Sequence, residues 1–352
     1  MRSLSRLSIL MVLIGLAAAG SVALGLGSLT REGSVWKKTA YSCVCRALLE
    51  DDAGRLYLGT FGAGLWIRTG ETWAQIRQTP GGLPDERLSK LLVEGEDLLV
   101  ATAGGGAARL HRPSGRWSPL TPFGEPPSRH FHALAILPDG GYLLGSVGDG
   151  LCLATGGRWI TLKEPDGLPS DWINDALPEA SGTWLATYAG LAYLEGTRVT
   201  RVEHPEQGWR DGNINVLARF QGNLFLGTGS GGLVERLEPL PGSTPAGSPQ
   251  RSPRRRVTYR RIPGIPDQVH ALLPVGDTLW IGTEEGLFRL LSDRAVERRE
   301  GPASASRAIK SLGLTRAGVV AGTDVGQVYL VDGKNWVCLF DHSTIHTGGN
   351  PR

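Results

Sequence analysis

The chain has 352 residues, of which 41% are hydrophobic and 20% charged, with 50 glycines, 22 prolines and a formal net charge of +3. This composition excludes a mainly disordered chain, and so small a net charge gives no argument for nucleic-acid binding. The ten tryptophans and the abundant glycine favour short strands joined by tight turns.

The N-terminus differs from the rest of the chain. Arg2 and Arg6 precede an uncharged, largely apolar run over residues 7–27. A basic segment followed by such a run is typical of an export signal, and the run is also long enough to cross a bilayer uncut. We therefore predict that residues 1–28 are a signal peptide or an N-terminal membrane anchor. The rest of the chain is expected to be extracytoplasmic, either periplasmic or secreted, with residues 7–27 as the alternative inner-membrane anchor.

One pattern recurs seven times, and the stretch LWIGTEEGLFRL from Leu279 shows it clearly. Each copy has an apolar strand, a Gly or Ala, a Thr or Ser, a short turn and a second strand. Successive copies of the Thr or Ser are 42, 44, 41, 41, 55 and 40 residues apart. A period of about 40–45 residues made of short strands is typical of propeller blades. The seven hydroxyl residues are Thr60, Thr102, Ser146, Thr187, Thr228, Thr283 and Thr323.

These repeats predict an all-β fold, a seven-bladed β-propeller of four-stranded antiparallel blades over residues 33–340. A strand A precedes each pattern, strands B and C make it up, and strand D follows, often with a tryptophan such as Trp73 or Trp336. The Gly or Ala before each Thr or Ser is expected where neighbouring blades pack closely. Stacking the blades buries sheet faces that no single blade buries alone.

The blocks LPDERLSKLLVEGEDLLVAT, from Leu83, and DQVHALLPVGDTLWIGTEEGLFRL, from Asp267, resemble the repeats of the two-component regulator propeller family. The resemblance covers residues of about 33 to 340. It implies an extracytoplasmic sensor propeller, a type usually fused to a transmembrane helix and a histidine kinase. Because the sequence ends at Arg352 without a kinase, we expect signalling only through a partner. Repeats of this kind indicate architecture and are poor indicators of chemistry.

Three segments lie outside the regular repeat. Residues 34–40 and 335–340 both fit the outer strand of the last blade, and we slightly favour closure of the ring by the N-terminal segment. Residues 239–256, rich in Pro, Gly, Ser and Arg, predict a disordered basic insertion. Its arginines suit anionic lipid or polysaccharide, although a solvated loop without a partner is the simpler interpretation. Residues 341–352 are predicted to be a disordered tail.

The four cysteines are too few for a disulfide scaffold. Half-buried thiols are the favoured interpretation, and a disulfide between distant segments remains the alternative. The residues concerned are Cys43, Cys45, Cys152 and Cys338.

No catalytic motif is found, so we predict that the protein is not an enzyme; a lyase or hydrolase with a histidine base is the least favoured alternative. Strand A lines the central channel of a propeller, so we aligned the seven A strands on one apolar residue each. Side chains on either side of this anchor face the channel, because strand side chains alternate between faces. The anchors are Val44, Leu88, Phe131, Ile173, Ile214, Val269 and Ile309.

The residues after the anchors are Cys45, Ser89, His132, Asn174, Asn215, His270 and Lys310, and those before them include Cys43. Together they predict a polar, mildly cationic funnel suited to a small anionic or sugar-like ligand. A lining that binds only water is the alternative. The ligand-binding candidates are Arg87, His130, His132, Trp172, Asn174, Asn213, Asn215, Gln268, His270 and Lys310, and the B–C turns add Phe61, Asp149, Tyr188, Glu284, Glu285 and Asp324.

We expect no cofactor and no metal, because His130 and His132 lie on the third blade and His270 lies far away on the sixth. The sequence thus favours an exported binding or sensor module whose partner is a small molecule, a glycan or an envelope protein, including a separate sensor kinase. An envelope interaction scaffold is the alternative. Neither nucleic acid nor membrane, beyond the N-terminal segment, is an expected partner.

Overall fold

The computed structural model describes residues 30–32, 35–37, 43–205, 208–237, 257–303, 305–333 and 335–345. The expected signal or anchor over residues 1–28 and the basic insertion over residues 239–256 lie outside these residues. The expected tail lies mostly outside them, since the description ends at Ile345. Within the described part, no helix is both long and apolar enough to cross a membrane.

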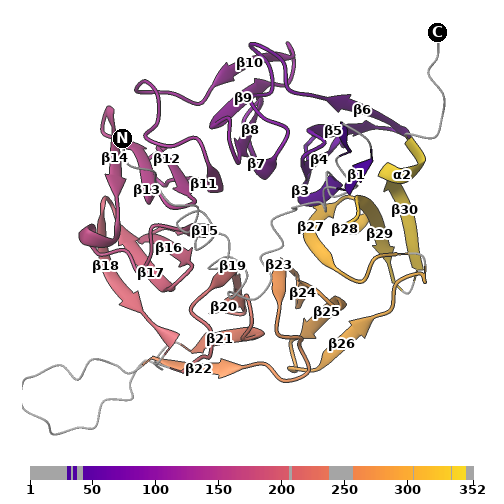
Figure 1. Ribbon diagram of the computed structural model, residues 1–352. Helices are drawn as coiled ribbons and strands as arrows, with labels where there is room; N and C mark the ends of the chain where they lie inside the picture. Colours follow the sequence, from indigo (N-terminus) through magenta and orange to yellow (C-terminus); the bar gives the residue numbers. More distant parts are fainter. Residues whose placement is uncertain are drawn as a thin grey trace, which may run out of the picture.

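Seven four-stranded antiparallel sheets surround a common axis, as the sequence predicts (Figure 1). The first strand of each sheet lies nearest the axis and the fourth lies at the outside. Blades one to three comprise β3 (Val44–Glu50), β4 (Leu56–Phe61), β5 (Leu65–Thr69) and β6 (Thr72–Ile76); β7 (Leu88–Glu94), β8 (Asp97–Thr102), β9 (Ala107–His111) and β10 (Arg116–Pro119); and β11 (Phe131–Ile136), β12 (Tyr142–Ser146), β13 (Leu151–Thr155) and β14 (Arg158–Leu162).

The remaining four blades follow the same order, with a 3-10 turn η2 (Glu164–Asp166) before blade four and a short helix α2 (His342–Ile345) after blade seven. They comprise β15 (Ile173–Glu179), β16 (Gly182–Thr187), β17 (Gly190–Glu195) and β18 (Arg198–Glu203); β19 (Ile214–Phe220), β20 (Asn223–Thr228), β21 (Leu233–Leu237) and β22 (Thr258–Arg261); β23 (Val269–Val275), β24 (Thr278–Thr283), β25 (Gly286–Leu291) and β26 (Val296–Arg299); and β27 (Ile309–Thr315), β28 (Gly318–Thr323), β29 (Gln327–Asp332) and β30 (Asn335–Asp341).

The repeated Thr or Ser closes the B–C turn of each blade. In blade one, the Thr60 hydroxyl donates to the carbonyl of Gly64 at 2.7 Å and accepts from the backbone N–H of Ala63 at 3.0 Å. This hydroxyl is fully buried; it satisfies the N–H of Ala63 in the tight turn and adds a second bond to the carbonyl of Gly64, which also accepts the backbone N–H of Thr60. The same residue bonds the turn at Thr102, Ser146, Thr187, Thr228, Thr283 and Thr323.

The residue before this Thr or Ser is small because the next blade lies against it. A Cβ placed on Gly227 would lie 2.6 Å from Cγ1 of Val269, and one on Gly145 would lie 2.7 Å from Cβ of Ile173. Real Cβ atoms do not approach so closely, so a larger residue would push neighbouring blades apart. The predicted role of these positions in blade packing is confirmed. Equivalent contacts join Gly59 to Leu88, Gly282 to Ile309 and Gly322 to Cys45.

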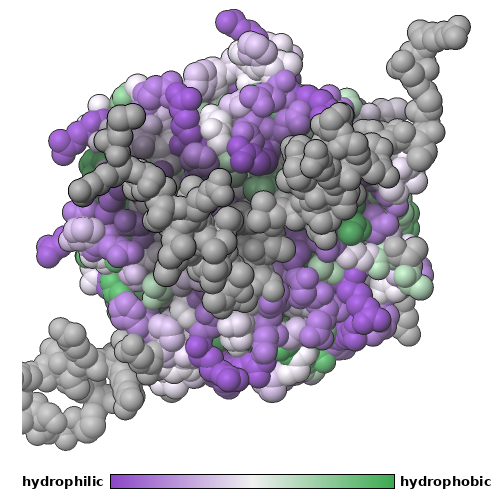
Figure 2. All heavy atoms as spheres, viewed as in Figure 1, coloured by the Kyte–Doolittle hydropathy of each residue, from purple (hydrophilic) through white to green (hydrophobic). Residues whose placement is uncertain are grey.

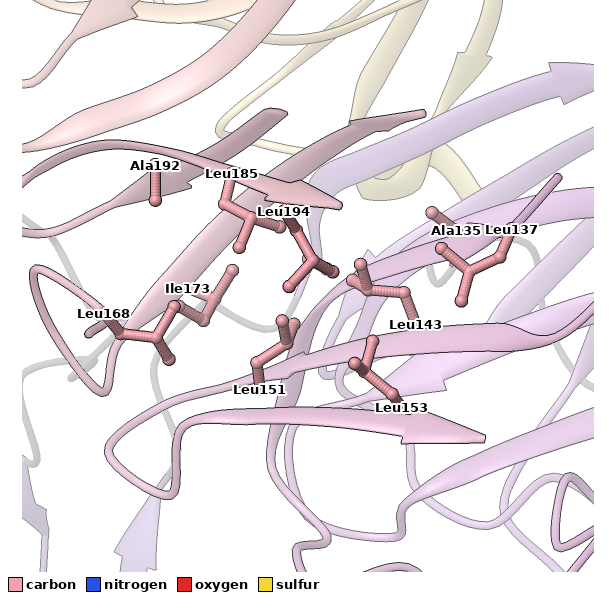
Figure 3. Close-up of a cluster of buried hydrophobic side chains, with 11 residues drawn as sticks. Ala135, Leu137, Leu143, Leu151, Leu153, Leu168, Ile173, Leu185, Ala192 and Leu194 are labelled. Atoms are coloured by element: carbon pink, nitrogen blue, oxygen red, sulfur yellow. The ribbon is translucent and has the colours of Figure 1, made fainter. Parts of the chain in front are cut away.

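Apolar cores fill the spaces between blades, as Figure 3 shows for blades three and four. There, Leu143, Leu151 and Leu153 lie opposite Leu185 and Leu194, and all five are buried. Each sheet therefore buries both of its faces against its neighbours, which is why the strands read as nearly continuous apolar runs.

Blade seven takes its outer strand from the C-terminal end of the chain, so the expectation of closure by residues 34–40 is wrong. Strand β30 pairs with β29 along its length, whereas β1 (Thr30–Glu32) and β2 (Val35–Lys37) pair only with each other. A short connection joins β29 to β30, and forming this local hairpin costs less chain entropy than bringing in the distant N-terminal segment.

The seam between blades seven and one therefore depends on side chains. Strands β27 and β28 pack against β3. The ring of Phe340 lies 5.0 Å from Trp66 and 4.9 Å from Trp73, and the Trp73 indole N–H donates to the carbonyl of Leu339 at 2.9 Å. Arg316 adds a backbone bond to the Glu50 carboxylate at 2.9 Å.

The glycine contacts make a stability prediction. We expect Gly227→Ala to lower the free energy of unfolding by about 2 kcal/mol, because its methyl would overlap Val269. Gly59→Ala is the matched control, since its Cβ would meet Leu88 at 3.3 Å, and its cost should be smaller. Urea denaturation measures both. Equal costs at the two positions would contradict close blade packing as the cause.

The closure makes a second prediction. Phe340→Ala should cost about 3–4 kcal/mol of unfolding free energy, because it removes a buried ring from the seam. Deletion of residues 30–37 should cost much less, because that hairpin is paired with itself. A deletion that destabilises more than Phe340→Ala would show that the N-terminal segment holds the ring together.

Candidate functional site

Every A strand carries a β-bulge at the same position, directly after the residue that pairs with the repeated Thr or Ser. A bulge adds one residue to a strand and re-aims its side chain, and bulges are frequent beside functional sites. In Figure 1 the seven strands that carry these bulges are those nearest the axis. We call the seven bulge residues the axial ring: Arg46, Ser89, His132, Asn174, Asn215, His270 and Lys310.

Arg46 replaces Cys45 in the ring predicted from the sequence. Cys45, rather than Val44, pairs with Thr60, and Cys45 packs against Gly322 of blade seven as the other anchors pack against their neighbouring blades. The blade-one alignment was therefore wrong by one residue. Its correction places an arginine among the ring residues, while both Cys43 and Cys45 are buried in the fold.

Three ring residues donate hydrogen bonds to the backbone of the next blade and so help to hold the propeller together. Ser89 donates to the carbonyl of Phe131 at 2.6 Å, and Asn215 donates to that of Val269 at 2.9 Å. Asn174 donates to the carbonyl of Ile214 at 2.8 Å and to Oδ1 of Asn213 at 2.9 Å. These bonds tie the bulge of one blade to the backbone of the next. Asn174, Asn213 and Asn215, three predicted ligand-binding residues, therefore lie in inter-blade contacts.

His270 and Lys310 share one carboxylate. Glu284, in the B–C turn of blade six, lies 2.8 Å from Nε2 of His270 and 2.5 Å from Nζ of Lys310, and these two nitrogens are 3.0 Å apart. The bond to His270, followed by that to Lys310, holds the pKa of Glu284 at about 2 although partial burial opposes the shift. Burial lowers the pKa of His270, so its imidazole is neutral at pH 7. The cluster is therefore a neutral histidine beside the ion pair of Lys310 and Glu284.

Arg46 of blade one, His132 of blade three and Trp172 just before blade four carry the other polar groups of the site. The guanidinium of Arg46 lies 5.4 Å from the ring centre of Phe61, and its charge lowers the pKa of both His132 and His270, so its side chain extends toward the axis. The ring of His132 meets that of Trp172 edge-on at 6.3 Å.

Polar atoms in this part lack partners. Trp172 stacks on Tyr188 at 5.4 Å, and within the described chain its indole N–H is buried without a hydrogen bond. Burial, together with the charge of Arg46, lowers the pKa of His132 to about 4, so His132 is neutral at pH 7. Its unfolded pKa of about 6.5 is higher, so the stability it contributes is present above pH 6.5 and falls as the pH drops toward 4.

The other candidates lie around these groups with their polar atoms in other contacts or exposed. Arg87 makes a two-bond pair with Asp85, at 2.9 and 2.8 Å. His130 is exposed, and Gln268 is half-buried and accepts the backbone N–H of Glu284 at its carbonyl. Among the turn residues, three adjoin the ring or Trp172: Phe61, Tyr188 and Glu284. Asp149 accepts the hydroxyl of Ser128, and Asp324 accepts that of Ser306. Glu285 is exposed.

A second charged pair, not expected from the sequence, lies one residue beyond the ring in the same strands. Lys90 of blade two reaches past blade three to Asp175 of blade four, with Nζ 2.8 Å from Oδ1. The other carboxylate oxygen of Asp175 accepts the backbone N–H of Leu217 in blade five at 3.0 Å. This pair ties three blades together and leaves neither charge uncompensated.

Sites away from the axis offer less. A surface pocket of about 220 Å³ lies beside β9 and the loop into blade three, where Glu125 and Arg129 pair at 3.6 Å. Over the described residues, no group of three metal-ligating side chains converges. All four cysteines are in the thiol form, and Cys45 and Cys152 are buried.

Solved structures share this propeller. The extracellular domains of the hybrid two-component systems BT4673 and BT3049 from B. thetaiotaomicron superpose with TM-scores of 0.62 and 0.64, and both are 16% identical over 81% and 82% of this chain. The chain spans only 38% and 39% of the length of those two proteins. Virginiamycin B lyase from Staphylococcus aureus also matches, with a TM-score of 0.60 and 13% identity over 82% of this chain and 94% of that one.

The fold is that of the two-component sensor propellers. The likeness predicted from the repeats is thus confirmed at the level of fold. At these identities the comparisons carry no information on which residues bind a ligand. No family model matches the sequence, and neither does any curated protein.

The proximity of Arg46 to His132 makes a prediction. We expect Arg46→Gln to raise the pKa of His132 above its value of about 4, because the substitution removes a positive charge that opposes protonation. The residual lowering should come mainly from burial. A pH titration of the histidine ring resonances by NMR measures the shift. Arg87→Gln is the matched control and should leave His132 unchanged, and an unchanged pKa in Arg46→Gln would place Arg46 away from this histidine.

Proposed function

We propose that this protein is a non-catalytic, sensor-type propeller that binds a small ligand at the axial ring, outside the cytoplasm. One observation carries the proposal: the ring is divided into residues that hold the blades together and residues whose polar groups have no such task. Ser89, Asn174 and Asn215 belong to the first set. His132 belongs to the second, and Trp172, which lies beside the ring and meets the edge of His132, has an indole N–H without a partner in the described chain.

A buried polar group without a partner destabilises a fold by about 1–3 kcal/mol, so a site that keeps one is a candidate for binding. Trp172 offers an aromatic surface beside the ring, which suits a small organic molecule, and its indole N–H has no partner in the described chain, as is also true of Trp66, Trp184 and Trp209. Tyr188 stacks on Trp172 and fixes its orientation. The ligand site is thus organised in advance, which lowers the entropy cost of binding.

The structural neighbours support a sensor role because two of them are extracellular domains of two-component systems. In this proposal the ligand-bound propeller acts through an envelope partner, with a separate sensor kinase as the first candidate. A purely scaffolding role is less well supported. The large exposed apolar side chains of the described chain are Phe123, Leu314, Val325 and Val337, and the last three occupy different strands or turns of blade seven instead of one patch.

A thermal-shift screen of the full chain tests the proposal. At least one of the small organic molecules screened should raise the melting temperature by several degrees. Trp172→Ala and His132→Ala should each abolish that rise. His111→Ala is the matched control, since His111 bonds to Ser114 and Glu96 away from the axis. Stabilisation that survives both ring substitutions would refute a site at the ring.

A further inference from the structure

Three cations other than Arg46 on the strands and loops around the axis are each paired with a carboxylate. Lys310 is paired with Glu284, Lys90 with Asp175, and Arg87 with Asp85. Within the described part of the chain, Arg46 makes no ion pair and no hydrogen bond, and its contact is with the face of Phe61. Of the two cationic ring residues, Lys310 thus has a carboxylate partner and Arg46 has none among the described residues.

This charge is costly for the fold. Arg46 is half-buried, and a guanidinium has five N–H donors that water satisfies only in part at such a position. The contact with Phe61 returns only about 0.5–2 kcal/mol. Burial also lowers the pKa of Arg46, although an arginine side chain remains charged at neutral pH. A half-buried guanidinium without a carboxylate partner in the described chain is a candidate binding site for an anion.

The surroundings limit the kind of anion. Glu284 already pairs with Lys310, so Arg46 is the one ring cation left for a ligand to neutralise, and a single negative charge suffices. The planar fork of a guanidinium matches the two oxygens of a carboxylate. Next to Arg46, His132 is neutral and meets the edge of Trp172, so an unsaturated or aromatic body would find flat rings beside the charge.

We propose that Arg46 binds the carboxylate of a small monocarboxylic acid, with the body of the ligand beside His132 and Trp172. This inference rests on the proposed ligand site at the axial ring and adds the chemical class of the ligand. The two carboxylate oxygens accept two N–H bonds from Arg46 and restore neutrality at the ring.

Isothermal titration calorimetry on the full chain tests it with benzoate as the probe and benzamide as its uncharged equivalent. Benzoate should bind at least tenfold more tightly than benzamide or sulfate. Arg46→Gln should weaken benzoate binding at least tenfold, and Arg46→Lys should weaken it less. Arg289→Gln is the matched control, since Glu297 already pairs with that arginine on the outer strands of blade six, and it should bind benzoate as the wild type does.

Each other outcome is decisive. Benzoate binding that Arg46→Gln leaves intact, or tighter binding of sulfate, would overturn the carboxylate site. Binding of benzamide or a neutral sugar that is lost in Trp172→Ala would also overturn it, while the ligand site at the ring would stand. Failure of all these probes, together with an empty screen, would overturn both proposals.

Folding of the variant is checked separately. Without ligand, Arg46→Gln should melt at the same temperature as the wild type or a higher one, because it removes an uncompensated charge. A large fall in melting temperature would assign Arg46 to structure and contradict the proposal.

Discussion

The contact between a glycine or alanine of one blade and the anchor residue of the next is the constraint on which the structure depends. At Gly145 and Gly227 an added Cβ would lie 2.7 and 2.6 Å from the next blade, so the blades pack at backbone distance. The hydroxyl after each of these positions fixes the B–C turn, and the residue after each anchor is forced into a bulge. Packing, turn and bulge thus follow from one short pattern, and their repetition places seven bulge residues around one axis.

The axial ring combines two tasks that compete for the same positions. Ser89, Asn174 and Asn215 bond to the next blade and strengthen the ring against opening. Arg46 and His132 make no such bond in the described part of the chain, so they add little to the fold. The ring thus keeps polar groups that do not serve the fold, a pattern expected where stability is given up for binding.

Much of this architecture was predictable because each blade repeats the same physical solution. Seven blades, four antiparallel strands in each and small residues at the blade contacts all follow from the spacing of one pattern. The closing strand was not predictable in this way, because residues 34–40 and 335–340 have similar sequences and only their spatial proximity to β29 separates them. A short hairpin connection decides it in favour of β30.

The site was only partly predictable. Ring positions in six blades followed from the alignment, but Arg46 was missed because Cys45 was not recognised as an anchor. Cys45 precedes the turn residue Thr60 by 15 positions in the sequence. Phe131 precedes Ser146 by the same number in blade three, which also has a long A–B turn. Pairings across blades, such as Lys90 with Asp175, leave no signal in a single sequence, because they depend on how far side chains reach in the assembled ring.

The central claim is that an uncompensated arginine at the axis makes the ring a site for a singly charged anion. Diffraction at the bromine absorption edge from crystals of the full chain soaked in sodium bromide tests it most directly, since bromide is located by its anomalous signal. The account predicts a bromide ion against the guanidinium of Arg46. Bromide ions bound elsewhere on the protein, with none at Arg46, would contradict it.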